Sequence, residues 1–381
     1  MTANKLTLPK RQLGRTGLQL SMLGMGGFHQ CEVDSGIVEE VAREFIAMGG
    51  NYFETARSYG QGGSELKLGR AIAGKREQLV LGSKTAKRDA ESAWRELNET
   101  LEALQTDHLD LYFLHNVFTS EDLTAVTAAQ GALSAFIRAK DEGMIKHIAI
   151  STHWPLILLD AIKVVPFEAV LIWGNYLDYC NYPEIPNEIL PVLRENDIGH
   201  LIMKPLADGF LHKSVDGAFR YALRENPACV VSGFNSVEML QADTAAVCRG
   251  ALDDDAGDEL LKNAPELGNY VCRQCRECSV LPGDQGAWLK KLFELEGKFD
   301  RQMNTLYSAD AGTYALQQRL CKWFGNGERA KSYYSEHEDN FAEIIGESGK
   351  IRFSGCRYGI DITRKIRIVK EKLTDGNLSR I

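Results

Sequence analysis

Leu109-Asp-Leu-Tyr-Phe-Leu-His115 is a short, almost continuously apolar run that ends in a histidine. Such a run is expected of a parallel β-strand that is covered on both faces. Further runs of the same character lie before and after it in the chain. The eight predicted strands are Ser21–Phe28, Asn51–Thr55, Val80–Thr85, Leu109–His115, His147–Thr152, Ala169–Asn175, His200–Pro205 and Cys229–Gly233.

Amphipathic helical patterns separate these runs. Apolar residues recur at intervals of three to four, for example from Ile37 to Met48 and from Ala90 to Leu104. Strands that alternate with helices in this way predict an α/β fold, a (β/α)8 TIM barrel. A doubly wound open sheet is the rival, but it would need a Gly-x-Gly-x-x-Gly turn after its first strand. Gly24, Gly26 and Gly27 do not keep that spacing.

The composition excludes several classes of protein. The chain has 381 residues, of which 44% are hydrophobic and 25% are charged, so it is neither disordered nor fibrous. Its formal net charge of −8 argues against a nucleic-acid partner. No apolar run approaches the roughly 18 residues that span a bilayer, and the polar N-terminus is not a secretory signal. We therefore expect a cytoplasmic protein without a membrane partner.

The sequence pattern changes near residue 263. Strand-like runs stop, three closely spaced cysteines appear, and charged helical stretches follow at Trp288–Met303 and Tyr314–Phe324. This change predicts two domains. A barrel is expected over residues 1–262, and a smaller, mostly helical domain over residues 263–381.

Four ionisable residues lie at or just after the ends of three successive predicted strands: Glu54, Tyr59, Lys84 and His115. In a (β/α)8 barrel the carboxyl ends of the strands build the active site. A buried Lys and Glu are costly unless they are paired, and a cation near a phenol lowers the phenol pKa. Each residue alone also fits a structural or surface role. Together they indicate a site in which Tyr59 exchanges a proton with a carbonyl oxygen.

Several segments resemble motifs of the aldo-keto reductases. These are Asn51–Gly60, Leu81–Lys84, Leu109–His115 and the opening Leu13-Gly-Arg-Thr-Gly17. The resemblance covers most of the predicted barrel. It implies a (β/α)8 barrel that binds a nicotinamide cofactor without a Rossmann turn. It also implies hydride transfer between that cofactor and a small-molecule carbonyl or alcohol substrate.

The resemblance also implies roles for the four strand-end residues. Tyr59 would be the general acid/base, Lys84 would tune its pKa, and His115 would orient the carbonyl. Glu54 stands where the family has Asp, so its arm is one methylene longer. Contact with Lys84 is therefore expected to shift, and a shift of about 1 Å can cost on the order of 100-fold in rate.

By the same resemblance, cofactor contacts follow the later strands. They are Ser151, Asn175, Met203, Lys204, Pro205, Leu206, Gly209, Gly233, Asn235 and Ser236. Gly233–Ser236 looks like the phosphate-binding turn. Members that prefer NADP place Arg or Lys just beyond this turn, whereas residues 233–248 contain neither, and Asp243 stands where an adenine-binding Asn is usual. A 2′-phosphate beside the carboxylates of Glu238 and Asp243 would also be poorly paired. We therefore favour NAD(H) over NADP(H), with both retained.

Cys272-x2-Cys275-x2-Cys278 is a strong metal-site motif. Three thiolates at this spacing suit one face of an iron–sulfur cube, whereas Cys-x2-Cys alone suits a zinc knuckle. The fourth cysteine of a bacterial ferredoxin motif is missing here. Gly355–Ile362 resembles the tail of such a motif and contains Cys356, and a subgroup of aldo-keto reductases carries a C-terminal ferredoxin-like [4Fe–4S] domain. Cys356 is therefore the expected fourth ligand of one [4Fe–4S] cluster, with Cys321 as the competing candidate.

Two functions follow. The first is an oxidoreductase that transfers hydride between NAD(P)(H) and a carbonyl or alcohol, with a cluster that either passes electrons to a redox partner protein or holds its domain folded. The second is an iron–sulfur electron-transfer or sensing protein whose barrel no longer turns over. Two departures from the family motivate the second: Glu54 in place of Asp, and the altered adenine contacts, with Asp243 in place of Asn.

Overall fold

The computed structural model describes residues 6–281, 283–304, 310–321, 326–347 and 355–376. The chain packs as two compact units. The first is Met1–Gly174, Ile185–Pro205 and Val215–Leu252, and the second is Asn175–Glu184, Leu206–Ser214 and Asp253–Ile381. The second unit thus takes two segments that follow predicted barrel strands in the chain. The boundary expected at residue 262/263 stays a prediction.

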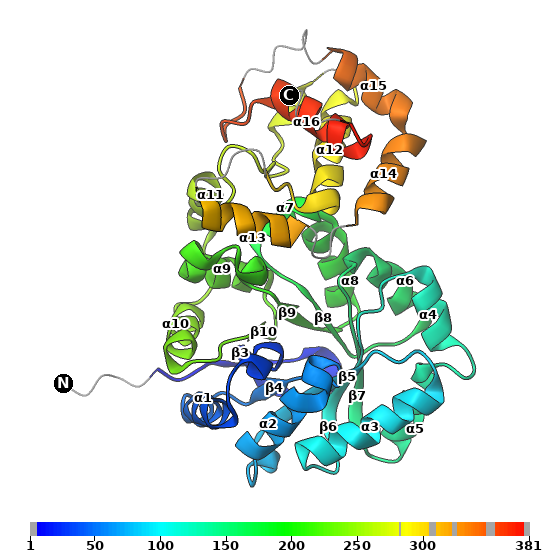
Figure 1. Cartoon of the computed structure of the whole chain (residues 1–381), viewed down its shortest axis with the longest axis vertical. Helices are drawn as coiled ribbons and strands as arrows, with labels where there is room; N and C mark the ends of the chain where they lie inside the picture. The colour runs from blue at the N-terminus through cyan, green and yellow to red at the C-terminus, as the bar shows by residue number, and fades with distance from the viewer. Residues whose placement is uncertain (1–5, 282, 305–309, 322–325, 348–354, 377–381) are drawn as a thin grey trace, which may run out of the picture. The chain divides into compact units, whose positions relative to one another are not determined.

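Eight parallel strands close into a barrel in the order β10-β3-β4-β5-β6-β7-β8-β9 (Figure 1). All eight predicted strands are present, and the open-sheet rival is wrong. The strands are β3 (Leu23–Gly26), β4 (Tyr52–Glu54), β5 (Val80–Thr85), β6 (Leu109–Leu114), β7 (Ile145–Ser151), β8 (Ala169–Trp173), β9 (Gly199–Met203) and β10 (Cys229–Ser232). The closed barrel, with helices between strands, is the arrangement that the continuous apolar runs require.

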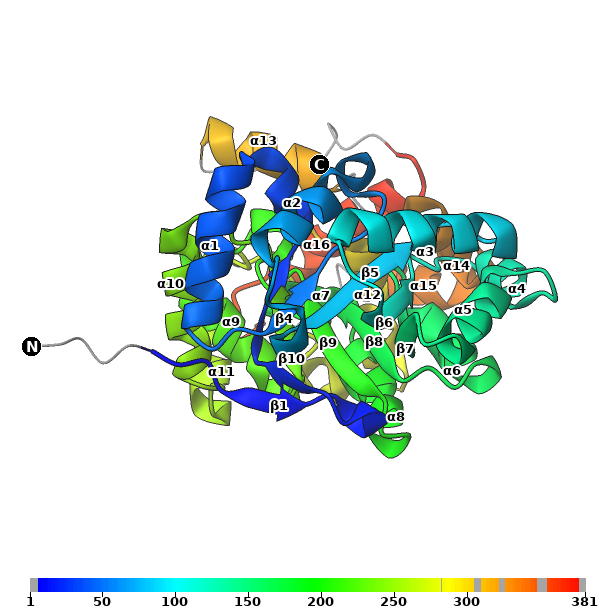
Figure 2. The same ribbon diagram turned by 90° about the horizontal axis from the view of Figure 1, so that it is seen from below.

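Amphipathic helices lie along the outside of the strands, as Figure 2 shows for α1 to α5. The predicted helix from Ala90 begins behind Asp89, whose carboxylate accepts a hydrogen bond of 2.8 Å from the amide of Ser92. The helices of this unit are α1 (Ser35–Ala47), α2 (Gly63–Ala71), α3 (Ala90–Leu104), α4 (Ser120–Thr127), α5 (Ala132–Asp141), α6 (Leu158–Val164), α8 (Leu190–Glu195), α9 (Val215–Ala222) and α10 (Val237–Cys248).

The interior of the barrel is filled by side chains and is not a pore. Tyr52, Leu111 and Phe113 are fully buried there. An N-terminal hairpin of β1 (Lys10–Gln12) and β2 (Gln19–Ser21) adds Leu13 and Leu20 to the same core. Packing at the amino-terminal edge stabilises the fold, so the carboxyl ends of the strands are left for chemistry.

The second unit is helical in the part of the chain that the structure describes. The predicted helices near residues 288–303 and 314–324 are confirmed as α12 and α13, and further helices were not predicted. Its helices are α7 (Tyr176–Asn181), α11 (Asp254–Asn263), α12 (Gln285–Asp300), α13 (Ala311–Cys321), α14 (Gly327–Glu336), α15 (Glu338–Glu347) and α16 (Ile362–Leu373). A buried apolar cluster that includes Leu289, Phe293, Phe341 and Ile366 forms its core. The ferredoxin-like character of this region stays a prediction. Across the described residues, no helix is long and apolar enough to cross a membrane.

Candidate active site

The four strand-end residues of the barrel unit are brought together as predicted. Glu54 is the last residue of β4, and Lys84 is the last but one of β5. Tyr59 begins a short 3-10 helix after β4, and His115 follows β6 directly. Parallel strands in register place these positions at one edge of the barrel, because Glu54 pairs with Gly82 two residues before Lys84.

Lys84 is the centre of the group. Its Nζ donates hydrogen bonds to the Thr55 carbonyl oxygen at 2.8 Å and to the Tyr59 hydroxyl at 3.2 Å. It also forms an ion pair with Glu54, and both side chains are almost inaccessible to solvent. Two buried charges are tolerated only as such a pair. The longer arm of Glu54 therefore reaches Lys84. The expected shift of this contact relative to the family Asp stays a prediction.

The ring of Tyr59 is half-buried and has two aromatic neighbours. Phe28 and His115 stand edge-on to its ring, with centroids 5.3 Å and 5.7 Å away. Burial, followed by the nearby Cys31 thiol, raises the pKa of Tyr59 well above its ordinary value. The expected lowering by Lys84 is therefore not found, because the effect of burial dominates the pKa of Tyr59. Tyr59 is a neutral phenol, the form that donates a proton.

His115 is uncharged at neutral pH. Burial, with help from Lys84 and Arg88, lowers the pKa of its imidazole to about 3. The Ser58 hydroxyl lies 3.4 Å from its Nδ1. A neutral imidazole keeps one N–H donor, so His115 can hydrogen-bond a carbonyl oxygen without carrying charge into the site.

A second buried polar group beside Lys84 was missed by the sequence analysis. Glu65 is fully buried and accepts hydrogen bonds from Ser83, Thr100 and Arg57 at 2.8, 2.8 and 3.1 Å. Ser83 precedes Lys84 in β5, and the amide of Arg57 donates to the Lys84 carbonyl oxygen. This carboxylate therefore ties β5 to the loop that carries Tyr59. The available signal in the sequence was the pair of opposite charges Arg57 and Glu65, eight positions apart.

Seven of the expected cofactor residues belong to the barrel unit: Ser151, Met203, Lys204, Pro205, Gly233, Asn235 and Ser236. Ser151 ends β7, is buried, and accepts a hydrogen bond of 3.3 Å from the amide of Asn116. Met203 ends β9, and Lys204 has a positive φ of 56°. These residues thus stand at the same edge of the strands as Glu54, Lys84 and His115.

The expected phosphate turn leads into a helix. Ser236 is the N-cap of α10, and its hydroxyl accepts a hydrogen bond of 3.2 Å from the amide of Met239. Gly233 lies so close to His29 that a Cβ there would stand 2.2 Å from the imidazole. A helix N-terminus attracts phosphate through its free amides and its dipole. The turn therefore fits a phosphate of the expected cofactor.

Asp243 is not the accessible carboxylate that we expected near the cofactor phosphate. It is buried and accepts a hydrogen bond of 2.6 Å from the Ser232 hydroxyl. Burial raises the pKa of its carboxyl to about 7. Asp243 therefore presents no exposed carboxylate that would repel a 2′-phosphate, and this part of the argument for NAD(H) is wrong.

The remaining expected cofactor residues, Asn175, Leu206 and Gly209, belong to the second unit. Asn175 is the N-cap of α7, and its side-chain oxygen accepts a hydrogen bond of 2.8 Å from the amide of Asp178. Leu206 and Gly209 lie in the short segment that ends at Ser214, where Asp208 and Gly209 both have positive φ.

All four expected cluster ligands also lie in the second unit. Cys272 is buried, and Cys275, Cys278 and Cys356 are half-buried. Burial raises the pKa of Cys272 to about 12, and burial with the neighbouring thiols of Cys275 and Cys356 raises the pKa of Cys278 to about 11. Within the described ranges, no three His, Cys, Asp or Glu side chains converge closely enough for a single metal ion. The side chain of Cys321 lies outside the described residues.

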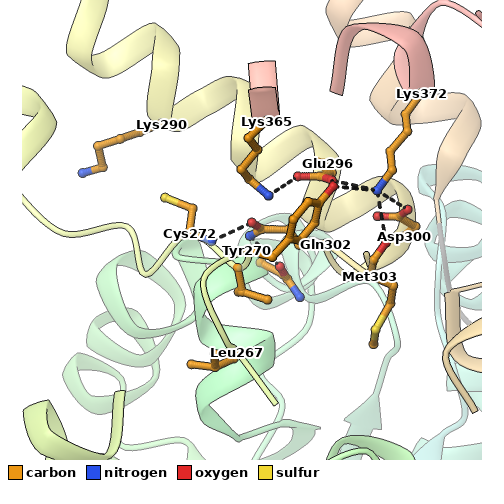
Figure 3. A network of polar contacts seen from close by, with 12 residues as sticks. Leu267, Tyr270, Cys272, Lys290, Glu296, Asp300, Gln302, Met303, Lys365 and Lys372 are labelled. Carbon is orange, nitrogen blue, oxygen red and sulfur yellow. Dashed lines mark hydrogen bonds and ion pairs between the residues drawn. The ribbon is translucent and has the colours of Figure 1, made fainter. Parts of the chain in front are cut away.

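A buried ion network lies beside Cys272 in the same unit (Figure 3). Glu296 on α12 accepts hydrogen bonds from Lys365 and Lys372 on α16 at 2.5 and 2.7 Å and from Tyr270 at 2.5 Å. Lys372 also pairs with Asp300 at 2.6 Å. This network joins the helix that follows Cys278 in the chain to the helix that follows Cys356.

Comparison with known proteins identifies the class. The sequence profile of the Aldo/keto reductase family matches residues 22–229, which is more than half of the chain. The chain therefore belongs to the aldo/keto reductase family, and an oxidoreductase function is supported. An uncharacterized oxidoreductase, YqkF, from Bacillus subtilis is 29% identical over 287 residues, which cover 72% of this chain and 86% of that protein.

Two further proteins are similar to this chain, the first in sequence and the second in fold. L-galactose dehydrogenase from Arabidopsis thaliana is 30% identical over 220 residues, which cover 53% of this chain and 66% of that protein. The holo form of the aldo-keto reductase AKR11C1 from Bacillus halodurans shares the fold, with a TM-score of 0.58 and 23% identity over 67% of this chain and 96% of that structure.

Proposed function

We propose that this protein transfers hydride between a nicotinamide cofactor and a small-molecule carbonyl or alcohol. The observation that supports the proposal is the hydrogen bond of 3.2 Å from the buried Lys84 ammonium to the Tyr59 hydroxyl, beside a neutral His115. This group combines a proton donor, a cation that stabilises the donor after it has lost its proton, and a neutral hydrogen-bond donor for the carbonyl.

The roles of the residues follow from their contacts. A bound nicotinamide supplies or accepts the hydride. In reduction, Tyr59 gives its proton to the carbonyl oxygen, and the hydrogen bond from Lys84 stabilises the phenolate that remains. Glu54 holds the Lys84 side chain in place through their buried ion pair. His115 orients the carbonyl through its N–H.

Residues of the strand ends and the α10 turn would hold the cofactor. Ser151 and Asn175 would contact the carboxamide, Met203 would pack against the nicotinamide ring, and Gly233–Ser236 would bind phosphate. We retain the preference for NAD(H), which now depends on the absence of Lys and Arg from residues 233–248 and on the exposed Glu238 in the first turn of α10.

Direct binding and turnover measurements test this function. Purified protein is titrated with NADH and NADPH and then assayed with a panel of aldehydes and ketones. We expect binding of a reduced nicotinamide and turnover that Tyr59→Phe abolishes while binding is kept. If neither nicotinamide binds, the proposal fails. If Tyr59→Phe turns over at the wild-type rate, the assignment of the acid fails.

We also propose one [4Fe–4S] cluster on Cys272, Cys275, Cys278 and Cys356. The spacing of the first three supports a cube, and the thiols of Cys275 and Cys356 both influence Cys278. Thiolates around a cube stand farther apart than the ligands of one ion, so a mononuclear site is not required. Iron and acid-labile sulfide are measured on anaerobically purified protein. One equivalent of zinc without iron would contradict the cluster.

The reading of the barrel as catalytically inactive is not favoured. It depended on Glu54 and on the altered adenine contacts. Glu54 keeps an ion pair with Lys84, which argues against an inactive barrel. Because hydride transfer in the proposed mechanism uses no cluster, the cluster either stabilises its unit or serves a redox partner protein.

A further inference from the structure

Arg301 is a buried arginine just beyond α12, and it contacts acidic residues of two separate segments, Asp178 and Asp208. Its Nε lies 3.2 Å from Oδ1 of Asp178, and its Nη1 donates to Oδ2 of Asp208 at 2.8 Å. All three residues belong to the second unit. Asp178 is fully buried, so its charge needs the guanidinium as a partner.

The first loop carries a proposed nicotinamide contact. The Asn175 side chain accepts a hydrogen bond from the Asp178 amide at 2.8 Å and donates one to the Asp178 carboxylate at 2.7 Å. Both polar atoms of the Asn175 amide are thereby oriented by Asp178, which Arg301 in turn neutralises. Arg301 therefore acts on Asn175 through one intermediate residue.

The second loop carries the proposed pyrophosphate contacts. Asp208 lies between Leu206 and Gly209, and Ala207 and Asp208 have positive φ values of 47° and 59°. Such a backbone is unfavourable for residues with a Cβ and persists when neighbours hold it. The contact with Arg301 supplies that restraint.

The same helix end also touches the proposed cluster site. Gln302 accepts a hydrogen bond of 2.7 Å from the Cys272 amide and donates one of 2.9 Å to Asn181, at the end of α7 (Figure 3 shows the former). Arg301 and Gln302 both have positive φ, 59° and 57°. Two successive strained residues thus join the cysteine loop to the loops named above.

We infer that Arg301 is a positioning residue for the dinucleotide. It fixes Asn175 through Asp178 and fixes the 206–214 segment through Asp208, so that the cofactor meets preformed loops. The inference rests on the proposed function. A preformed site binds more tightly because less conformational entropy is lost on binding.

The test compares nicotinamide affinity in four full-length proteins. Arg301→Met removes both contacts. Methionine also has a Cβ, so the backbone strain at the positive φ of this position is unchanged. Arg301→Lys keeps the charge without the forked geometry. Lys372→Met is the matched control, because it also removes a buried cation with two carboxylate partners in this unit, Glu296 and Asp300. We expect Kd to rise at least about tenfold in Arg301→Met, less in Arg301→Lys, and less than twofold in Lys372→Met.

Asp208→Asn keeps the test decisive if Arg301→Met does not fold, because it leaves the Arg301–Asp178 pair intact. We expect a Kd about threefold higher and faster amide exchange over residues 206–214 without cofactor. Unchanged Kd in this variant and in any folded Arg301→Met overturns the inference. If the wild type binds no nicotinamide, the proposed function fails, and the exchange measurement alone decides whether Arg301 orders the loop.

Discussion

The two proposed sites are assembled in different ways. In the barrel unit, Glu54, Lys84 and His115 stand on three neighbouring strands within 62 positions of chain, and the strand register alone brings them together. In the second unit, Cys278 and Cys356 are separated by 78 positions, and helices must pack to bring them near each other.

This difference shows what a motif in a sequence can specify. A parallel barrel turns the end of every strand toward one edge, so a residue's place in the pattern is also its place in space. Helix packing has no such rule, and here it depends on the buried contacts of Glu296 with Lys365 and Lys372. Substitutions in the barrel site are therefore expected to lower the rate of catalysis while the fold is kept. Substitutions around the cysteine site are expected to destabilise the fold of the second unit.

The largest expected effect is chemical. Lys84→Met removes the cation beside Tyr59, so the phenolate loses its stabilisation, and we expect kcat to fall by about 100-fold to 10,000-fold. Loss of Lys84 also leaves Glu54 buried without a partner, so Lys84→Met/Glu54→Leu is the matched double variant. Steady-state kinetics measures the change. A double variant that folds and turns over as fast as the wild type would show that Lys84 does not act on Tyr59.

The barrel could be predicted largely from the sequence. Continuous apolar runs gave the strands, and the four ionisable residues at their ends were brought together as expected. Electrostatics could not be predicted in the same way. The pKa of Tyr59 depends on its removal from solvent and on the nearby Cys31 thiol, and the role of Asp243 depends on its contact with Ser232. Neither feature appears in a linear motif.

The next effect concerns the fourth cysteine. Cys356→Ser should lower the iron content of anaerobically purified protein from about four atoms per chain to near zero, because a cube needs four ligands. Cys321→Ser tests the competing ligand, and Cys248→Ser in the barrel unit is the control. Iron loss in Cys321→Ser with full iron in Cys356→Ser would reverse the assignment.

The cysteine region shows why the rest was not predictable. The cysteines can be recognised in the sequence, but the helices α14, α15 and α16 were not predicted from it. The sequence does not predict the network of Glu296, Lys365 and Lys372. Glu296 is separated from Lys365 by 69 positions and from Lys372 by 76 positions. Contacts of that range are set by tertiary packing.

A third change breaks this packing directly. Glu296→Gln leaves Lys365 without a charged partner and Lys372 with only Asp300, and breaking a buried ion pair typically costs about 3 to 5 kcal/mol. We expect a lower midpoint of thermal unfolding and loss of iron, while Tyr59-dependent turnover per folded molecule is kept. Glu294 forms an ion pair with Lys298 on the same helix. Glu294→Gln is therefore the control for destabilisation of α12 by the loss of any buried carboxylate. Iron retention in Glu296→Gln would mean that the network does not hold the cysteines.

The smallest effect is the pH dependence of stability. In the barrel unit, His115 and Asp243 contribute to the free energy of unfolding with opposite pH dependence, so their contributions nearly cancel. Burial lowers the pKa of His115 to about 3, so below pH 6.5 the unfolded chain binds a proton that the folded chain does not, and stability falls as the pH drops from 6.5 toward 3. Burial raises the pKa of Asp243 to about 7, so the folded chain binds a proton first, and stability rises as the pH drops from 7 toward 3.8.

Between pH 7.5 and pH 5 each group contributes about 2 kcal/mol with opposite sign. Urea unfolding of His115→Gln should therefore show stability that increases on acidification, and Asp243→Asn should show stability that decreases. His115→Gln/Asp243→Asn should restore the pH dependence of the wild type, since both terms are removed. If Asp243→Asn leaves the slope unchanged, then its carboxyl is ionised at neutral pH, and the charge that the sequence analysis placed near the cofactor phosphate would have to be reconsidered.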